Sequence, residues 1–170
     1  MSKKFKIGIL GGGQLGMMLI EAAKSNTINS DIELNVLEPD TQASCRDLAD
    51  NFINGDFQEA DTVYNFGKEQ DVVTIEIEKV SIKGLEKLES AGVKVIPPSK
   101  LIKTIQDKGL QKQFLIDEKI PTAPFEYCNS KLPENIKLPI VQKVRKGGYD
   151  GYGVKILKNN TDLALSLIHI

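Results

Sequence analysis

Apolar residues along the first hundred positions follow two different spacings. Short runs rich in Ile, Val and Leu are typical of buried strands, whereas apolar residues every three or four positions are typical of helices. We expect strands over residues 5–10, 32–39, 71–80 and 93–97, and helices over residues 14–25, 44–52, 56–70 and 82–92. Strands that alternate with helices of about 10–15 residues pair in parallel through right-handed crossovers. The pattern therefore predicts an α/β fold with a doubly wound parallel sheet.

The pattern changes after the dipeptide Pro97-Pro98, where we place a domain boundary. A long helical stretch follows over residues 99–120, weakened or broken at Gly109, and then an extended segment over residues 121–128. Residues 138–157 have the pattern of a strand, a glycine-rich loop and a second strand. This second part has too few residues to build a full core by itself. We therefore expect two domains, residues 1–98 and residues 99–170.

Composition restricts the classes of function. The 170 residues are 41% hydrophobic and 26% charged with a net charge of −1, which gives no electrostatic reason to expect nucleic acid as a partner. No apolar run approaches the roughly 20 residues of a membrane span, and the N-terminus lacks the apolar core of a signal peptide. The two cysteines, Cys45 and Cys128, are far apart, so we expect free thiols in a reducing cytoplasm. The lone histidine, His169, makes histidine catalysis and histidine-rich metal sites improbable.

The first strand leads into glycines 11, 13 and 16, which have the spacing G-x-G-x-x-G of a dinucleotide-binding turn. The acidic residue that would bind the ribose has two candidates, Glu38 and Asp40, at the end of the second strand. The spacing alone is a weak signal. It is equally compatible with a different phosphate or carboxylate ligand at the helix N-terminus, or with a purely structural turn.

Two carboxylates occur near the end of the third strand, in the sequence VTIEIEKV. Alternation along a strand places Glu76 and Glu78 on one face with Thr74. Interior parallel strands are normally apolar on both faces, and open α/β sheets bind ligands at the carboxyl ends of their strands. We therefore favour a functional role for these carboxylates over a solvated strand face.

The sequence QKVRKGGYDGYGVKI is the most informative stretch of the chain. It has neither the lysine pattern nor the following helix of a P-loop. Glycines between two strands allow a loop to cover a nucleotide, with backbone N–H groups directed at the phosphates. Lys143 on the incoming strand and Lys146 at the loop edge are candidate phosphate partners. The structural alternative is a long flexible hairpin, which leaves the tyrosines and the aspartate among the glycines unexplained.

Taken together, the strings GGGQLGMML, VLEPD, VVTIEIEKV, VIPPSKLIKTIQDKGLQKQFL, IPTAPF and GGYDGYGV strongly resemble the N5-carboxyaminoimidazole ribonucleotide synthetases of the ATP-grasp superfamily. The resemblance covers about residues 5–158, and the combination of strings is specific although each one is weak. It implies a Rossmann-like pre-ATP-grasp domain followed by the start of an ATP-grasp domain. Such enzymes use MgATP and bicarbonate to carboxylate the amine of 5-aminoimidazole ribonucleotide in purine biosynthesis.

The resemblance also implies roles for individual residues. Glu76, Tyr149 and Asp150 would be catalytic, and Glu76 would accept a hydrogen bond from the substrate amine or orient it. The ribonucleotide would contact Gly13, Gln14, Leu15, Glu76 and Tyr149. The cofactor ATP would contact Lys108, Lys143, Gly148, Tyr149, Asp150, Gly151, Tyr152, Gly153 and Val154. The Mg²⁺ ligands and the adenine contacts would lie outside this chain, and the full-length enzyme would be a homodimer.

The chain departs from the family pattern in several places. Relatives often have arginine at position 108 and commonly after Gly151, where this chain has Lys108 and Tyr152. Family members are roughly twice as long, and the terminal SLIHI matches nothing expected there, so we expect an N-terminal fragment that is inactive alone. Other ATP-grasp ligases, an NAD- or FAD-dependent oxidoreductase and a non-catalytic binding module remain alternatives.

Overall fold

The computed structural model describes residues 4–25, 31–128, 136–148 and 152–162. The chain divides into two compact units, Met1–Lys103 and Thr104–Ile170, which are described separately. This division falls within a helix shortly after the boundary expected at residues 98 and 99. The domain limits expected from the sequence stay a prediction.

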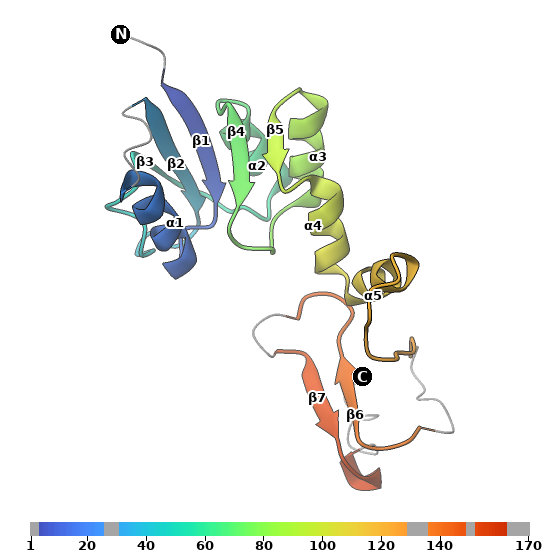
Figure 1. Cartoon of the computed structure of the whole chain (residues 1–170). Helices are drawn as coiled ribbons and strands as arrows, with labels where there is room; N and C mark the ends of the chain where they lie inside the picture. Colours follow the sequence, from blue (N-terminus) through green and yellow to red (C-terminus); the bar gives the residue numbers. More distant parts are fainter. Residues whose placement is uncertain (1–3, 26–30, 129–135, 149–151, 163–170) are drawn as a thin grey trace. The chain divides into compact units, whose positions relative to one another are not determined.

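The first unit is built on a five-stranded parallel sheet, which confirms the predicted α/β class (Figure 1). Across the sheet the strand order is β3-β2-β1-β4-β5. Strands β2 and β3 are added on one side of β1, and β4 and β5 on the other, so the switch point of the topology lies between β1 and β4, where open sheets bind ligands. The strands are β1 (Phe5–Leu10), β2 (Ile32–Glu38), β3 (Asn51–Asn54), β4 (Val72–Ile75) and β5 (Lys94–Ile96).

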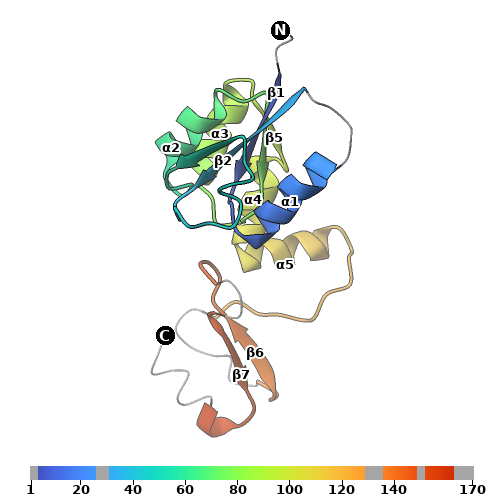
Figure 2. The same cartoon turned by 90° about the vertical axis from the view of Figure 1, so that its left-hand side faces the viewer.

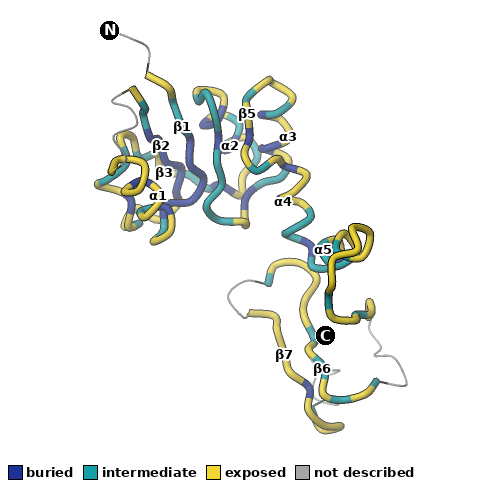
Figure 3. The backbone as a smooth tube through the Cα atoms, viewed as in Figure 1, coloured by how far each residue is buried: buried dark blue, intermediate teal, exposed yellow. Residues whose placement is uncertain are grey.

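Helices cover both faces of this sheet (Figure 2). Helix α1 (Gln14–Ser25) lies on one face, and helices α2 (Ala60–Gly67) and α3 (Ile82–Ser90) lie together on the other. Each face has its own buried cluster: Ile9, Ile20, Leu34, Val36 and Cys45 beneath α1, and a larger one, with Leu10, Leu37, Val63, Val73, Leu85 and Leu88, beneath α2 and α3. The inner strands are therefore buried on both sides, as parallel sheets require (Figure 3).

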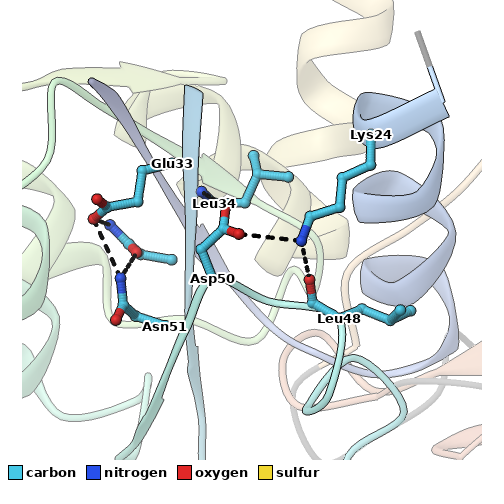
Figure 4. Close-up of polar contacts among 7 residues, drawn as sticks. Lys24, Glu33, Leu34, Leu48, Asp50 and Asn51 are labelled. Carbon is cyan, nitrogen blue, oxygen red and sulfur yellow. Dashed lines mark hydrogen bonds and ion pairs between the residues drawn. The ribbon is translucent and has the colours of Figure 1, made fainter. Parts of the chain in front are cut away.

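Polar contacts fix the pairing of β2 with β3 (Figure 4). Asn35 is buried in β2, and its amide donates to Glu33 at 3.1 Å and to Gln70 at 2.8 Å, while its carbonyl accepts from Asn51 at 2.8 Å. A buried amide with all its partners in place favours one strand register over the alternatives. On the other side, Asp50 accepts from the Leu34 amide at 2.8 Å and pairs with Lys24 of α1 at 3.2 Å.

Helix α4 (Ser99–Gln106) spans the division between the units, and α5 (Lys108–Asp117) belongs to the second. Strands β6 (Ile140–Lys143) and β7 (Val154–Leu157) form an antiparallel pair, in agreement with the predicted strand, loop and strand. The pairing extends one step further, because the Val144 amide donates to the Gly153 carbonyl at 2.8 Å. Gly153 has φ +74°, and a Cβ there would overlap the Val144 side chain, so only glycine suits this position.

Three predicted elements were wrong in detail. Residues 44–52 form turns followed by β3, not a helix, because Asp50 and Asn51 pair with β2 instead. The third strand ends at Ile75, so Glu76 and Glu78 follow β4 and do not alternate within it. The long helix is interrupted at Asp107, which caps α5, and Gly109 lies inside the first turn of that helix.

Candidate functional site

The turn after β1 lies at the carboxyl edge of the sheet, at the switch point. Gly11 has φ +102°, and its amide donates to the Leu37 carbonyl at 3.1 Å. On the other side, the Glu76 amide donates to the Leu10 carbonyl at 2.9 Å, so the segment after β4 is fastened to the same turn. The turn is thus held between the ends of β2 and β4, where ligands of such sheets bind.

Glu38 at the end of β2 is a residue whose role the sequence pattern missed. Its carboxylate is buried and accepts the Gly12 amide at 2.8 Å through Oε2 and the Asp40 amide at 3.0 Å through Oε1. Both oxygens therefore support the protein's own backbone and use about two of the roughly four acceptor sites of the carboxylate. The burial of this carboxylate, more than its hydrogen bonds, disfavours contact with a ribose hydroxyl and with it the dinucleotide interpretation of the opening glycines.

Cys45 packs against Gly12 of the turn. Its side chain is fully buried, and its amide donates to the Gly12 carbonyl at 3.2 Å. A Cβ at Gly12 would lie 2.5 Å from the Cys45 sulfur, so the thiol occupies the space beside that glycine. Burial raises the pKa of the Cys45 thiol, and the neighbouring Glu38 charge raises it further. Cys45 and the exposed Cys128 are both free thiols, as predicted.

Glu76 is half-buried against the turn. A Cβ at Gly11 would overlap its Oε2, and a Cβ at Gly16 would lie 3.8 Å from its Cγ and 2.9 Å from the Gly11 carbonyl oxygen. Burial raises the pKa of Glu76, and the charge of Glu38 adds to the effect. A carboxylate in this setting is poorly solvated and gains much by accepting a donor from a ligand. Glu78, by contrast, is exposed.

The first residues of α1 lie beside this carboxylate. Gly16 is buried under the turn, while Gln14 and Leu15 are exposed, Leu15 to 64%. The Met17 amide donates to the Gly13 carbonyl at 2.9 Å, which makes Gly13 the residue that opens the helix. The amides of a first helical turn have no partner within their helix and favour anionic oxygens. The structure thus brings Gly13, Gln14, Leu15 and Glu76 to one edge.

The second unit contains the other predicted residues. Lys143 ends β6 with an exposed side chain, and Lys108 opens α5 with a half-buried one. Gly148, Tyr152, Gly153 and Val154 flank the loop, and a Cβ at Gly148 would lie 2.8 Å from the Tyr152 carbonyl oxygen. Tyr149, Asp150 and Gly151 lie outside the described residues. Asp107 and Arg145, which contact one another here, were not among the predicted site residues.

Metal-ligand clusters, membrane-spanning helices and surface hollows are further features to consider in the described ranges. The part of the chain that the structure describes contains no group of three His, Cys, Asp or Glu side chains arranged to hold a metal ion. No helix within the described ranges is long and apolar enough to cross a bilayer. An open hollow of about 780 Å³ on the outer side of α2 and α3 is lined by Asp61, Tyr64, Lys83, Glu86, Lys87, Ser90 and Ala91.

Comparison with known proteins identifies this architecture. The model of the ribonucleotide synthetase preATP-grasp domain matches residues 4–106. The N5-carboxyaminoimidazole ribonucleotide synthase of Staphylococcus epidermidis is 32% identical over 163 residues, which cover 92% of this chain and 42% of that protein. The crystal structure of carboxyaminoimidazole ribonucleotide synthase from Aspergillus clavatus complexed with ATP is 33% identical with a TM-score of 0.85, over 97% of this chain and 44% of that one.

A second structure of the Aspergillus clavatus enzyme, in complex with ADP and 5-aminoimidazole ribonucleotide, is 32% identical with a TM-score of 0.80, over 99% of this chain and 44% of that one. The chain spans less than half the length of the curated relatives it matches. The family match covers more than half of the chain, and the Staphylococcus epidermidis relative aligns with 92% of it. The chain therefore belongs to the family of ribonucleotide synthetase preATP-grasp domains, through residues 4–106.

Proposed function

We propose that this chain provides ribonucleotide and ATP contacts for the ATP- and bicarbonate-dependent carboxylation of 5-aminoimidazole ribonucleotide to N5-carboxyaminoimidazole ribonucleotide in purine biosynthesis. An enzyme that catalyses this reaction is a carbon–nitrogen ligase of the ATP-grasp superfamily. Relatives named N5-carboxyaminoimidazole ribonucleotide synthase support the proposal, as does the Aspergillus clavatus complex with ADP and 5-aminoimidazole ribonucleotide. We further propose a cytoplasmic enzyme that is a homodimer at full length, with neither nucleic acid nor a membrane as partner.

The observation that carries the proposal is the placement of Glu76 against the glycine turn. Its carboxylate is half-buried beside Gly11 and Gly16, and both burial and Glu38 raise its pKa. An N–H donor from the substrate amine would relieve this poorly solvated charge, so binding and orientation of the amine come from the same contact. Gly13, Gln14 and Leu15 would line the same pocket wall, with the first amides of α1 available to an anionic oxygen.

In the second unit, Lys108 and Lys143 would contact the phosphates of ATP, and residues 148–154 would form the loop above them. Cationic side chains and backbone amides that are already in position stabilise a transferring phosphoryl group without reorganisation. Tyr149 and Asp150 are proposed as catalytic residues of this loop. Mg²⁺ would accompany ATP, with its ligands outside this chain, and neutralise phosphate charge; we assign no step of this chain to it.

Calorimetric titration with 5-aminoimidazole ribonucleotide tests the proposal. We expect the chain to bind the ribonucleotide and Glu76→Gln to weaken binding about tenfold or more, because a hydrogen bond to a charged group is worth about 1.5–3 kcal/mol. Glu78→Gln, the same change on an exposed neighbour, is the matched control and should bind like the wild type. Equal affinities of the Glu76→Gln variant and the wild type would refute the role of Glu76.

A titration followed by NADH fluorescence addresses the oxidoreductase alternative. Because the Glu38 carboxylate is buried and its Oε2 accepts the Gly12 amide, we expect no saturable binding of NADH. Saturable NADH binding together with no binding of the ribonucleotide would overturn the proposed function in favour of a dinucleotide enzyme.

A further inference from the structure

In the described part of the second unit, the carboxylate of Asp107 accepts hydrogen bonds from two separate segments of the chain. Its side chain is only 3% exposed, and its Oδ1 accepts the Gly109 amide at 3.0 Å and the Leu110 amide at 3.2 Å, which caps α5. The same oxygen accepts Nε of Arg145 at 2.7 Å. One carboxylate oxygen thus joins the first turn of a helix to a residue directly before the glycine loop.

The two segments are also joined through their backbones. The Lys108 amide donates to the Arg145 carbonyl at 2.9 Å, and Asp107 and Lys146 form an isolated antiparallel bridge. The Lys146 ammonium lies 3.7 Å from the second oxygen of Asp107. Residues far apart in the sequence therefore run side by side for a short distance, immediately before Gly147 and Gly148.

Tyr127 closes the arrangement. Its hydroxyl donates to the Gly109 carbonyl at 2.9 Å, and the Arg145 guanidinium lies 5.4 Å from the centre of its ring. A Cβ at Gly109 would lie 2.5 Å from the tyrosine ring and 3.1 Å from Nε of Arg145, so the glycine makes this close approach possible. The contact is built with tight packing around it and is more than an ion pair on an open surface.

Charge explains why a buried acid is useful at this place. Lys108, Arg145 and Lys146 come together where one helix and one loop begin, and these like charges repel. Asp107 offsets these charges by pairing with Arg145 and Lys146. The Arg145 hydrogen bond and the two capping amides outweigh the effect of burial and lower the pKa of Asp107, so the acid is ionised around neutrality.

We propose that Asp107 and Arg145 are a positioning pair, which holds the start of the glycine loop against the first turn of α5 and so presents Lys108 and the loop together to nucleotide phosphates. This inference rests on the proposed nucleotide role of the loop. Neither residue need touch the nucleotide.

Asp107→Asn removes the negative charge of the pair but keeps one oxygen that can accept the two capping amides and Nε of Arg145. Asparagine caps a helix as well as aspartate does, so α5 should keep its start while the charged contact with Arg145 is lost. Asp117→Asn is the matched control, because Asp117 lies exposed at the far end of the same helix. Arg145→Met removes the other partner and keeps an apolar stem over Tyr127.

Amide hydrogen exchange without nucleotide is the first measurement. We expect the Lys108 amide to exchange about three- to tenfold faster in Asp107→Asn, the range between an exposed pair and a buried charged hydrogen bond, with the Leu110 amide unchanged. The double variant Asp107→Asn with Arg145→Met should be no worse than the poorer single variant, as for two members of one interaction. Asp117→Asn should match the wild type.

Binding is the second measurement, with MgATP and 5-aminoimidazole ribonucleotide as separate probes. We expect Asp107→Asn to weaken MgATP about tenfold and to leave the ribonucleotide unaffected, which a general loss of structure would not do. Unchanged Lys108 exchange, or faster exchange with unchanged MgATP affinity, would overturn the positioning role alone. A wild-type chain that binds no MgATP would refute the nucleotide role of the loop, and the positioning role with it.

Discussion

Replacing Glu38 by glutamine should loosen the glycine turn without changing its volume. The carboxylate accepts two backbone amides, those of Gly12 and Asp40, through different oxygens. Glutamine keeps only one acceptor oxygen and directs an NH₂ group at the other amide. If the glutamine oxygen faces Asp40, the buried Gly12 amide is left without an acceptor; if it faces Gly12, the amide of the exposed Asp40 loses its acceptor.

The size of the effect follows from two opposing contributions. A hydrogen bond to a charged, buried acceptor is worth about 1.5–3 kcal/mol. Removing the charge also relieves the repulsion felt by Glu76, since the Glu38 charge contributes to the raised pKa of that residue. We therefore expect a net loss of about 1–2 kcal/mol, which for a domain of this size lowers the melting temperature by roughly 4–8 °C for each kcal/mol.

Thermal unfolding followed by circular dichroism measures the loss, with Glu69→Gln on the exposed turn after α2 as a control expected to stay within about 0.5 kcal/mol of the wild type. Carbon-13 titration provides a second reading. Burial is the main cause of the raised pKa of both Glu76 and the Cys45 thiol, and the charge of Glu38 is the second. Both pKa values should therefore fall towards their ordinary values in Glu38→Gln. An unchanged melting temperature and an unchanged Glu76 titration would refute the structural role of Glu38.

Two further predictions concern the first unit. Gly12→Ala places a methyl group 2.5 Å from the Cys45 sulfur and should lower the free energy of unfolding by about 1–3 kcal/mol. The double variant with Cys45→Ala should be more stable in urea than Gly12→Ala alone. Failure of this rescue would contradict the packing of the thiol against Gly12. Burial alone would raise the pKa of Asp50, but a β2 amide and Lys24 outweigh it and lower the pKa, so the stabilisation it provides is present above the ordinary carboxyl pKa and fades as the pH falls towards the lowered value. The difference in stability between the wild type and Asp50→Asn should therefore shrink on acidification from pH 7, and a constant difference in urea midpoints would contradict this linkage.

The sequence predicts well those elements whose signals are local. The six residues of β1 run into glycines and then into α1, and each transition has its own residue type. Helix α3 ends where Gly92 adopts φ +86°, as expected from a glycine after the last apolar position. The break between α4 and α5 also had a local signal, because Asp107 is a favoured N-cap residue, although the flexibility of Gly109 suggested a break there instead.

Elements that depend on distant contacts were not predictable in this way. The apolar residues of the segment 44–52 have helical spacing, yet Leu48 and Ala49 pack beneath α1 from within turns. Strand β3 has only four residues, NFIN, and its conformation comes from pairing with β2 and from the contacts of Asp50. Tertiary contacts therefore override local preference in this region.

The same distinction explains what the opening glycines could not reveal. A dinucleotide enzyme and this chain both have an acidic residue at the end of the second strand, so spacing alone does not separate them. The difference is where the carboxylate points. The Glu38 carboxylate points inward to the Gly12 amide, and the acid beside the turn is Glu76, from the segment after β4, which the fingerprint does not include. The proposed ligand of the turn would thus meet the half-buried carboxylate of Glu76, because the Glu38 carboxylate accepts two backbone amides of the protein itself.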